Sequence, residues 1–191
     1  GWSRRMPLRD VAKKAASIPL LFEPGTKMRY SNVGIDIGAT VVEVVTGMPW
    51  EDFLKKRVFD PLGMTSSTFK PSDEMLKRRM SLYTLSKKRR PKKIPYAPSM
   101  QAPFADDGVF ASAGAGLWTT ARDQLKFYRM LMNLGKGDNG VRILKEETVK
   151  SILAKSTRPK RLGGYSLGLT APNEDNENQW FGHGGAYGTN C

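Results

Sequence analysis

The sequence is poor in the residues that build cross-links and metal sites. It contains one cysteine, Cys191, and one histidine, His183, among 191 residues. A single thiol cannot form an internal disulfide or a cysteine-based zinc cluster, and one imidazole cannot supply a multi-histidine metal site. The sequence therefore predicts neither a metal centre nor a cofactor.

Long apolar runs are also missing. No uninterrupted apolar stretch approaches the ~20 residues that a membrane span needs. The first ten residues, GWSRRMPLRD, lack the charged and then apolar profile of a signal peptide. We expect no membrane span, and no targeting segment is visible. The hydrophobic share of 39% and the charged share of 26% are typical of a domain with a buried core.

Charge is unevenly distributed. The 31 basic residues exceed the 18 acidic ones, which gives a formal net charge of +13, and nine of the basic residues lie within 77–93, where there is no acid. Pro91 interrupts this run and favours an extended, exposed segment. Two interpretations stay open, a solvated loop and a contact with an anionic surface. The run 87–93 has no aromatic residue on which a base could stack, so nucleic-acid binding is disfavoured.

Apolar periodicity and capping residues predict that the first part of the chain is mainly helical. Pro24–Gly25 marks a turn, Ser31 or Asn32 can cap the helix that follows, and Gly47 can end it. The expected helices cover 8–18, 33–46, 49–59, 120–134 and 145–154. The segment 71–116 is expected to be mostly loop, with at most short elements.

Several helical positions carry packing predictions. Small residues suit close contact between helices in the second helix, and an i, i+4, i+7, i+11 stripe suits burial in the fourth. A capping box at its start, with Thr120 and Asp123, supports that fourth helix. The small residues are Gly34, Gly38 and Ala39, and the stripe is Ala121, Leu125, Tyr128 and Met132.

The last forty residues change in character. Residues 165–170 and 179–183 have the pattern of two strands joined by an acidic loop, and a third strand is expected to begin at Ala186. Residues 1–160 would thus be mainly helical, and residues 161–191 would begin a sheet. Helices first and strands last predict an α+β fold.

Two short motifs could carry chemistry. His183, Gly184 and Gly185 end an aromatic strand, where glycines allow close approach to backbone amides. Tyr30 and Asn32 are two residues apart in an extended segment, so their side chains point the same way. Each motif taken alone favours a structural role, as a packed ring or a helix cap.

These motifs, together with other blocks in the same order, resemble the serine β-lactamase and penicillin-recognising enzyme superfamily. The similarity is to the branch of class C β-lactamases, D-alanyl-D-alanine carboxypeptidases and related esterases. The matching blocks cover nearly the whole chain and lie at residues 20–25, 30–32, 47, 60–65, 114–123, 165–168 and 181–185.

The resemblance implies a β-lactamase-like (transpeptidase-like) fold, with mainly the helical domain and part of the antiparallel sheet present. It also implies acyl transfer through a serine-bound intermediate, on esters, small peptides or β-lactams. Tyr30 would remove and return the serine proton, and Asn32 would orient the substrate. His183, Gly184 and Gly185 would line the strand edge. The family further suggests a periplasmic or secreted location.

One element of the family pattern is absent from its expected place. The family's Ser-x-x-Lys motif precedes the tyrosine motif, whereas here Ser67 to Lys70 follows it, in a block that the family uses as a turn. We therefore expect the nucleophilic serine to lie outside this chain, together with the remaining strands of the sheet, and the isolated chain to be inactive. The alternative is an inactive binding or structural module whose basic segment 77–93 contacts an anion.

The identity of residue 183 affects which substrates are expected. His183 stands where β-lactamases commonly have lysine, a permanent cation for a substrate carboxylate. An unperturbed imidazole is mostly neutral at pH 7. Esters or small peptides are therefore favoured over β-lactams.

Overall fold

The computed structural model describes residues 6–27, 29–86, 89–94, 111–154, 168–170 and 181–185. These residues belong to two compact units, each assembled from segments that are separate in the sequence. The first unit comprises Gly1–Pro19, Ser31–Lys55 and Ser66–Thr119. The second comprises Leu20–Tyr30, Lys56–Thr65 and Thr120–Cys191.

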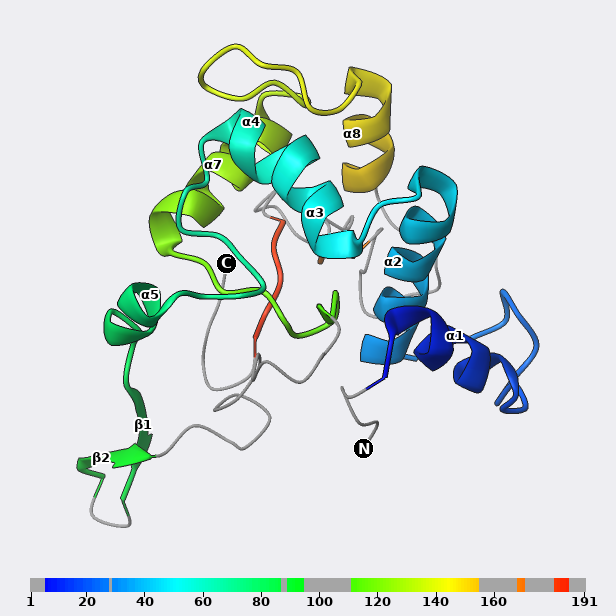
Figure 1. The fold of residues 1–191 in the computed structure, drawn as a ribbon, viewed down its shortest axis with the longest axis horizontal. Helices are drawn as coiled ribbons and strands as arrows, with labels where there is room; N and C mark the ends of the chain where they lie inside the picture. The colour runs from blue at the N-terminus through cyan, green and yellow to red at the C-terminus, as the bar shows by residue number, and fades with distance from the viewer. Residues whose placement is uncertain are drawn as a thin grey trace. The chain divides into compact units, whose positions relative to one another are not determined.

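Helices dominate the described residues, and the one sheet found among them is a two-stranded antiparallel hairpin. This composition agrees with the α+β class predicted from the sequence. In chain order (Figure 1) the elements are α1 (Leu8–Ala16), α2 (Asn32–Thr46), α3 (Trp50–Leu54), the π-helical η1 (Lys55–Phe59), α4 (Asp60–Leu62), α5 (Asp73–Lys77), β1 (Leu82–Leu85), β2 (Pro91–Ile94), α7 (Ala121–Met132) and α8 (Glu146–Leu153).

The ends of α2 confirm the capping predictions. Ser31 is extended, with φ −151°, and its hydroxyl accepts the backbone N–H of Gly34 at 3.1 Å. Gly47 adopts the left-handed conformation, with φ 68°, which glycine favours because it has no Cβ. The turn predicted at Pro24–Gly25 is also present, since Gly25 has φ 83°.

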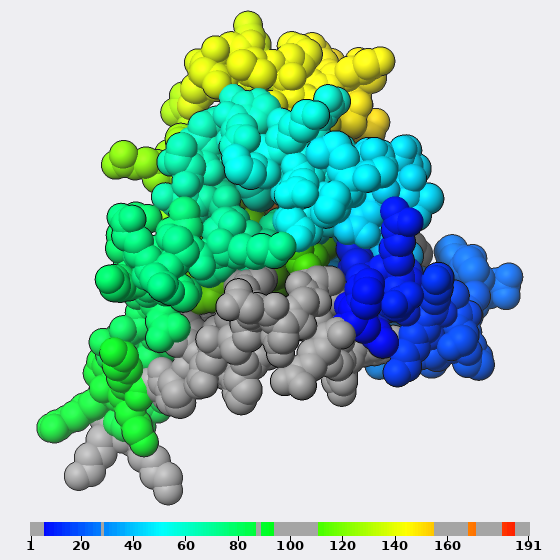
Figure 2. Space-filling model, viewed as in Figure 1, coloured from blue at the N-terminus to red at the C-terminus, as the bar shows by residue number. Residues whose placement is uncertain are grey.

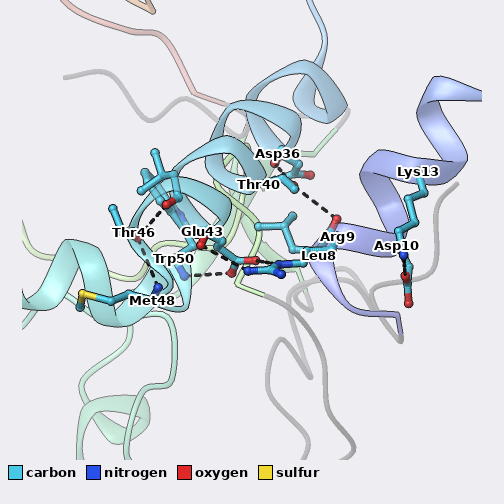
Figure 3. Close-up of polar contacts among 11 residues, drawn as sticks. Leu8, Arg9, Asp10, Lys13, Asp36, Thr40, Glu43, Thr46, Met48 and Trp50 are labelled. Atoms are coloured by element: carbon cyan, nitrogen blue, oxygen red, sulfur yellow. Dashed lines mark hydrogen bonds and ion pairs between the residues drawn. The ribbon is translucent and has the colours of Figure 1, made fainter.

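Helices α1 and α2 pack against each other in the first unit, and polar contacts fix their register (Figure 3). The hydroxyl of Thr40 donates to the carbonyl oxygen of Leu8 at 3.4 Å. The guanidinium of Arg9 donates to the carbonyl oxygen of Glu43 at 3.3 Å. The carboxylate of Glu43 accepts the backbone N–H of Trp50 at 3.0 Å, which ties the start of α3 to α2.

Helix α2 has an unusual distribution of side chains. Its buried positions are Asp36, Ala39 and Thr40, two of them polar. Its outer side exposes between 38% and 78% of each of five large apolar residues, namely Ile35, Ile37, Val41, Val44 and Val45. The prediction of close packing holds for Ala39, which is 3% exposed, and is wrong for Gly38, which has no atom within 4 Å of an added Cβ.

The carboxylate of Asp36 links α2 to the segment 111–119. It accepts the hydroxyl of Ser112 at 3.0 Å and the backbone N–H of Gly114 at 3.2 Å. Gly114 also lies against the backbone of Asn32, so that an added Cβ would be 2.8 Å from the Asn32 carbonyl oxygen. The start of α2 is thus fastened by a buried acid on one side and a glycine contact on the other.

Two clusters of apolar side chains form the interior. In the first unit the buried apolar residues are Leu8, Val11, Ala39, Phe69, Leu82 and Ala111. In the second unit they are Phe59, Leu62, Met64, Met130, Leu131 and Val149.

The helix that begins at Trp50 continues further than expected. The sequence predicts its end before Asp60, but η1 leads directly into α4, and Leu62 is buried. Pro61 lies in the first turn of α4, where its missing N–H costs nothing and its fixed φ suits the helix. Gly63, with φ 66°, ends the helix.

Helix α7 begins where the capping box predicts, and the hydroxyl of Thr120 accepts the backbone N–H of Asp123 at 3.2 Å. The predicted buried stripe is wrong. Leu125 and Met132 are 56% and 67% exposed, whereas Met130 and Leu131 are buried. Lys126 forms an ion pair with Asp123 within the helix and donates to the carbonyl oxygen of Gly63 outside it, so the helix turns Met130 and Leu131 inward while Lys126 contacts Gly63.

The segment after α7 turns sharply. Leu134 and Gly135 both have positive φ, and the N–H of Gly135 bonds the carbonyl oxygen of Met130 at 2.8 Å. A Cβ at Gly135 would collide with the Leu144 carbonyl oxygen, so glycine is required there. Helix α8 then buries Val149 completely, as its periodicity predicts.

The strands predicted near the end of the chain are only partly within the described residues. Thr170 and Gly182 form an antiparallel bridge, with N–H to O distances of 2.8 and 3.2 Å. The remainder of both strands and the strand predicted from Ala186 lie outside the described residues. The division of the chain at residue 160 stays a prediction.

Across the parts that the structure covers, we find no single helix long and apolar enough to cross a membrane. Two helical segments, Asn32–Thr46 and Trp50–Leu62, meet that criterion only when joined, and they are bent by 79°.

Replacing Asp36 with Ala should destabilise the first unit. It removes the acceptor shared by Ser112 and Gly114, and each donor left without a partner costs about 1–3 kcal/mol. We expect the free energy of unfolding, measured by urea denaturation, to fall by about 2–3 kcal/mol. Asp52→Ala, at an exposed position, should change it by less than about 1 kcal/mol. Equal effects of the two substitutions would contradict this role of Asp36.

Glycine-to-alanine substitutions should have opposite effects at two positions. Gly114→Ala should lower the melting temperature, because the new methyl group would meet the backbone of Asn32. Gly38→Ala should raise stability by up to about 1 kcal/mol, since the site is helical and open. Thermal unfolding followed by circular dichroism measures both. An unchanged melting temperature in Gly114→Ala would show that the close contact with Asn32 is not needed.

Candidate active site

Tyr30 lies at the end of a short irregular segment, directly before the cap of α2. Its side chain is 59% exposed. The next residue, Ser31, uses its hydroxyl to cap the helix at Gly34, so the middle residue of the Tyr-Ser-Asn motif has a structural task. Tyr30 therefore presents its phenol from a position that the helix cap fixes.

His183 follows a residue held by backbone pairing. Gly182 is buried and exchanges two hydrogen bonds with Thr170. The imidazole of His183 is half-buried, and Gly184 and Gly185 are exposed after it. The bridge thus fixes the chain immediately before the histidine. Gly184 is also a bridge residue, and both glycines are exposed.

The structure brings Tyr30 and His183 together. Their ring centroids are 6.0 Å apart, and the ring planes are inclined at 45°. Both residues belong to the second compact unit, although they come from opposite ends of the chain. This proximity is a tertiary relation that no sequence spacing could establish.

A second aromatic contact supports the strand that carries His183. Phe181 and Tyr128 lie with ring centroids 5.9 Å apart and planes inclined at 45°. Phe181 is two residues before His183, so in an extended segment both side chains are on the same side. Tyr128, which the periodicity placed in a buried stripe of α7, is half-buried and packs against this strand.

Asn32 is the first residue of α2 and is exposed, and it belongs to the first unit. Its backbone is held by the contact with Gly114 and, one turn further along, by the buried Asp36. The sequence motifs gave no role to Asp36 or Ser112, although Gly114 is the first residue of the matching block 114–123. The feature of the sequence that could have pointed to Asp36 is an acidic residue in the interior of a helix otherwise rich in Val, Ile and Ala.

Ser67 and Lys70, the ends of the Ser-x-x-Lys motif in this chain, each contact a residue outside the motif. The hydroxyl of Ser67 lies 2.8 Å from that of Thr119, and the amine of Lys70 pairs with Glu51 at 3.1 Å. Between them Thr68 forms an antiparallel bridge with Trp118. The prediction that this block is a structural turn is confirmed, because it is not a helix on which residues i and i+3 share a face.

Among the residues that the structure describes, no three His, Cys, Asp or Glu side chains gather in a way that could hold a metal ion. The chemistry available at the candidate site is that of a phenol, an imidazole and exposed backbone groups.

Comparisons with known proteins agree with these motifs. Protein Rv1367c of Mycobacterium tuberculosis is 35% identical over 135 residues, which cover 71% of this chain and 32% of that protein. The lovastatin esterase of Penicillium rubens is 31% identical over 163 residues, or 85% of this chain and 39% of the esterase. The chain thus spans about a third of the length of these curated relatives.

The fold is shared with solved structures. The octameric penicillin-binding protein homologue from Pyrococcus abyssi superposes with a TM-score of 0.69 at 22% identity, over 98% of this chain and 40% of that one. Relatives of this chain include proteins named as an esterase, a serine beta-lactamase-like protein and a putative carboxypeptidase. The Beta-lactamase family model matches residues 2–191. The chain belongs to the beta-lactamase family, and it has the β-lactamase-like transpeptidase fold.

Proposed function

We propose that this chain supplies the tyrosine and the His-x-Gly side of the acyl-transfer site of a serine hydrolase, whose nucleophilic serine lies outside these residues. The observation that carries the proposal is the 6.0 Å separation of the Tyr30 and His183 rings. The two motifs that the family resemblance assigns to one site are far apart in sequence and adjacent in space. A purely structural tyrosine would not need to be 59% exposed beside a histidine.

The proposed reaction has two steps. The phenolic oxygen of Tyr30, in its deprotonated form, takes the proton of the serine hydroxyl while the serine oxygen attacks the substrate carbonyl, and Tyr30 then gives this proton to the leaving group. The acyl-enzyme is hydrolysed when water, deprotonated in the same way, attacks the ester carbon and releases the serine. Asn32 would orient the substrate, and Gly184 and Gly185 would contact it along the strand edge.

The proposed substrates are esters or small peptides in preference to β-lactams. The carboxylate of a β-lactam is best bound by a permanent cation, and His183 replaces the lysine that would provide one. The lovastatin esterase among the relatives supports the preference for esters over β-lactams.

An inactive member of the family, acting as a binding or structural module, is the second candidate. The observation that favours it is the basic segment 77–93, whose described part is exposed at Arg89–Lys93. A Ser-x-x-Lys segment in the same polypeptide, ahead of Tyr30, would support the serine hydrolase over the binding or structural module.

The isolated chain should not react with serine-directed probes. The hydroxyl of Ser67 is hydrogen-bonded to that of Thr119, and the amine of Lys70 forms an ion pair with Glu51. We therefore expect no activated serine among these residues. Incubation with a fluorophosphonate, followed by intact mass spectrometry, should show no added mass. A stoichiometric adduct mapped to Ser67 would overturn both the role of the turn and the external nucleophile.

A polypeptide that carries these residues together with a preceding Ser-x-x-Lys segment should hydrolyse a short-chain aryl ester faster than a chromogenic cephalosporin. Tyr30→Phe should lower kcat for the ester by about 10²–10⁴, the usual contribution of a proton-transfer group. Tyr83→Phe, at another exposed tyrosine, should leave kcat unchanged.

Residue 183 should set the ranking of the two substrates. His183→Lys should shift the ratio of kcat/KM toward the cephalosporin by about tenfold or more, because a permanent cation then faces its carboxylate. His183→Gln, which is neutral, is the matched control and should not shift the ratio. A wild-type preference for the cephalosporin would contradict the proposed substrate class.

A further inference from the structure

The basic segment 77–93 is built around a regular hairpin. Strands β1 and β2 pair in an antiparallel register that sets Tyr83 opposite Lys93 and Leu85 opposite Pro91. Residues directly opposite one another share a face of a sheet, and so do residues two apart on one strand. Tyr83, Leu85, Pro91 and Lys93 therefore lie on one face.

This face is open to solvent. Tyr83 and Leu85 are 60% and 63% exposed, and Met80, just before β1, is 64% exposed. Leu82, whose side chain is on the opposite face, is 7% exposed, so the hairpin is anchored at its base through one face only. Figure 2 shows the green side chains of this segment spread outward at the lower left.

Cations surround the exposed apolar residues. Arg89, Arg90, Lys92 and Lys93 are all exposed. In the part of the chain that the structure describes, Arg90, Lys92 and Lys93 have no acidic partner within ion-pair distance. No acid occurs in the sequence between 77 and 93. Lys93 shares the face of Tyr83 and Leu85, whereas Lys92 lies on the opposite face with Thr84. The hairpin therefore presents uncompensated positive charge on both of its faces, next to apolar side chains that are exposed on one of them.

The turn of the hairpin adds an independent observation. Arg89 has φ 56°, a conformation that glycine or asparagine adopts at lower cost. Two backbone hydrogen bonds hold the turn. The N–H of Arg89 donates to the carbonyl oxygen of Ser86 at 2.8 Å, and the N–H of Ser86 donates to the carbonyl oxygen of Arg90 at 2.9 Å. An arginine thus stands at a position that glycine would occupy at lower cost, and it adds a cation to the tip of the hairpin.

We propose that the hairpin β1–β2 binds the surface of a membrane rich in anionic phospholipids. The basic side chains contact the phosphate headgroups, while Tyr83 and Leu85 enter the interfacial layer. Tyrosine suits that layer because one end of its side chain is apolar and the other is polar. A nucleic acid would engage the cations equally well but would leave Leu85 and Met80 in water, and Tyr83 alone offers no row of stacking platforms.

The experiment measures sedimentation of the chain with vesicles of phosphatidylcholine, either pure or mixed with phosphatidylglycerol, at ~50 and ~200 mM salt. We expect binding to the anionic vesicles alone, weaker at the higher salt but still measurable because of the apolar contacts. Equal binding to both vesicle types, or no binding, would overturn the proposal. Binding of a DNA duplex without binding of the anionic vesicles would assign the hairpin to nucleic acid instead.

A triple variant tests the charges. Arg90→Gln, Lys92→Gln and Lys93→Gln together should weaken vesicle binding roughly 100-fold, since each basic residue near an anionic surface contributes about fivefold. The matched control replaces three exposed basic residues of the second unit, and this change should weaken vesicle binding much less. Its substitutions are Lys56→Gln, Arg57→Gln and Lys136→Gln. Equal losses in both variants would show that net charge, rather than the hairpin, drives binding.

A double variant tests the apolar contact. Tyr83→Ser with Leu85→Ser should weaken binding roughly tenfold and abolish the part that survives high salt. Both positions are exposed, so the melting curve should match that of the wild type, and this match is checked by circular dichroism. A double variant that folds normally and binds as the wild type does would refute insertion of this face.

Discussion

The buried carboxylate of Asp36 is the constraint on which the first unit depends. An acid can be buried only when hydrogen bonds replace the water it loses, and here Ser112 and Gly114 supply them. These donors come from a segment nearly eighty residues further along the chain, so satisfying one polar group determines where that segment runs. The same carboxylate fixes the rotation of α2. With Asp36, Ala39 and Thr40 turned inward, the valines and isoleucines of the helix must face outward.

Features set by local chemistry could be predicted from the sequence. A hydroxyl before a helix satisfies a free amide, and a glycine after it accepts a positive φ, so Ser31, Gly47 and Thr120 mark real helix ends. These rules need only a few neighbouring residues. For that reason the bounds of α1, α2, α7 and α8 agree with expectation to within about three residues.

Features set by tertiary contacts could not be predicted. Helix α7 has more than one apolar side, and the side that includes Met130 is buried in a helix that contacts Gly63 through Lys126. Nothing in the periodicity of α7 refers to Gly63. In the same way, Pro61 seemed to end a helix because proline breaks helix interiors, yet the change from π to α winding places it in a first turn.

The candidate site shows the same division between local and distant information. Sequence motifs could nominate Tyr30 and His183 because each has a recognisable setting. Their adjacency depends instead on the bridge between Thr170 and Gly182 and on the packing of Phe181 against Tyr128, which position the strand that carries the histidine. The residues that position the histidine beside Tyr30 are a glycine, a threonine and two aromatic rings, and none of them has a chemical signature of its own.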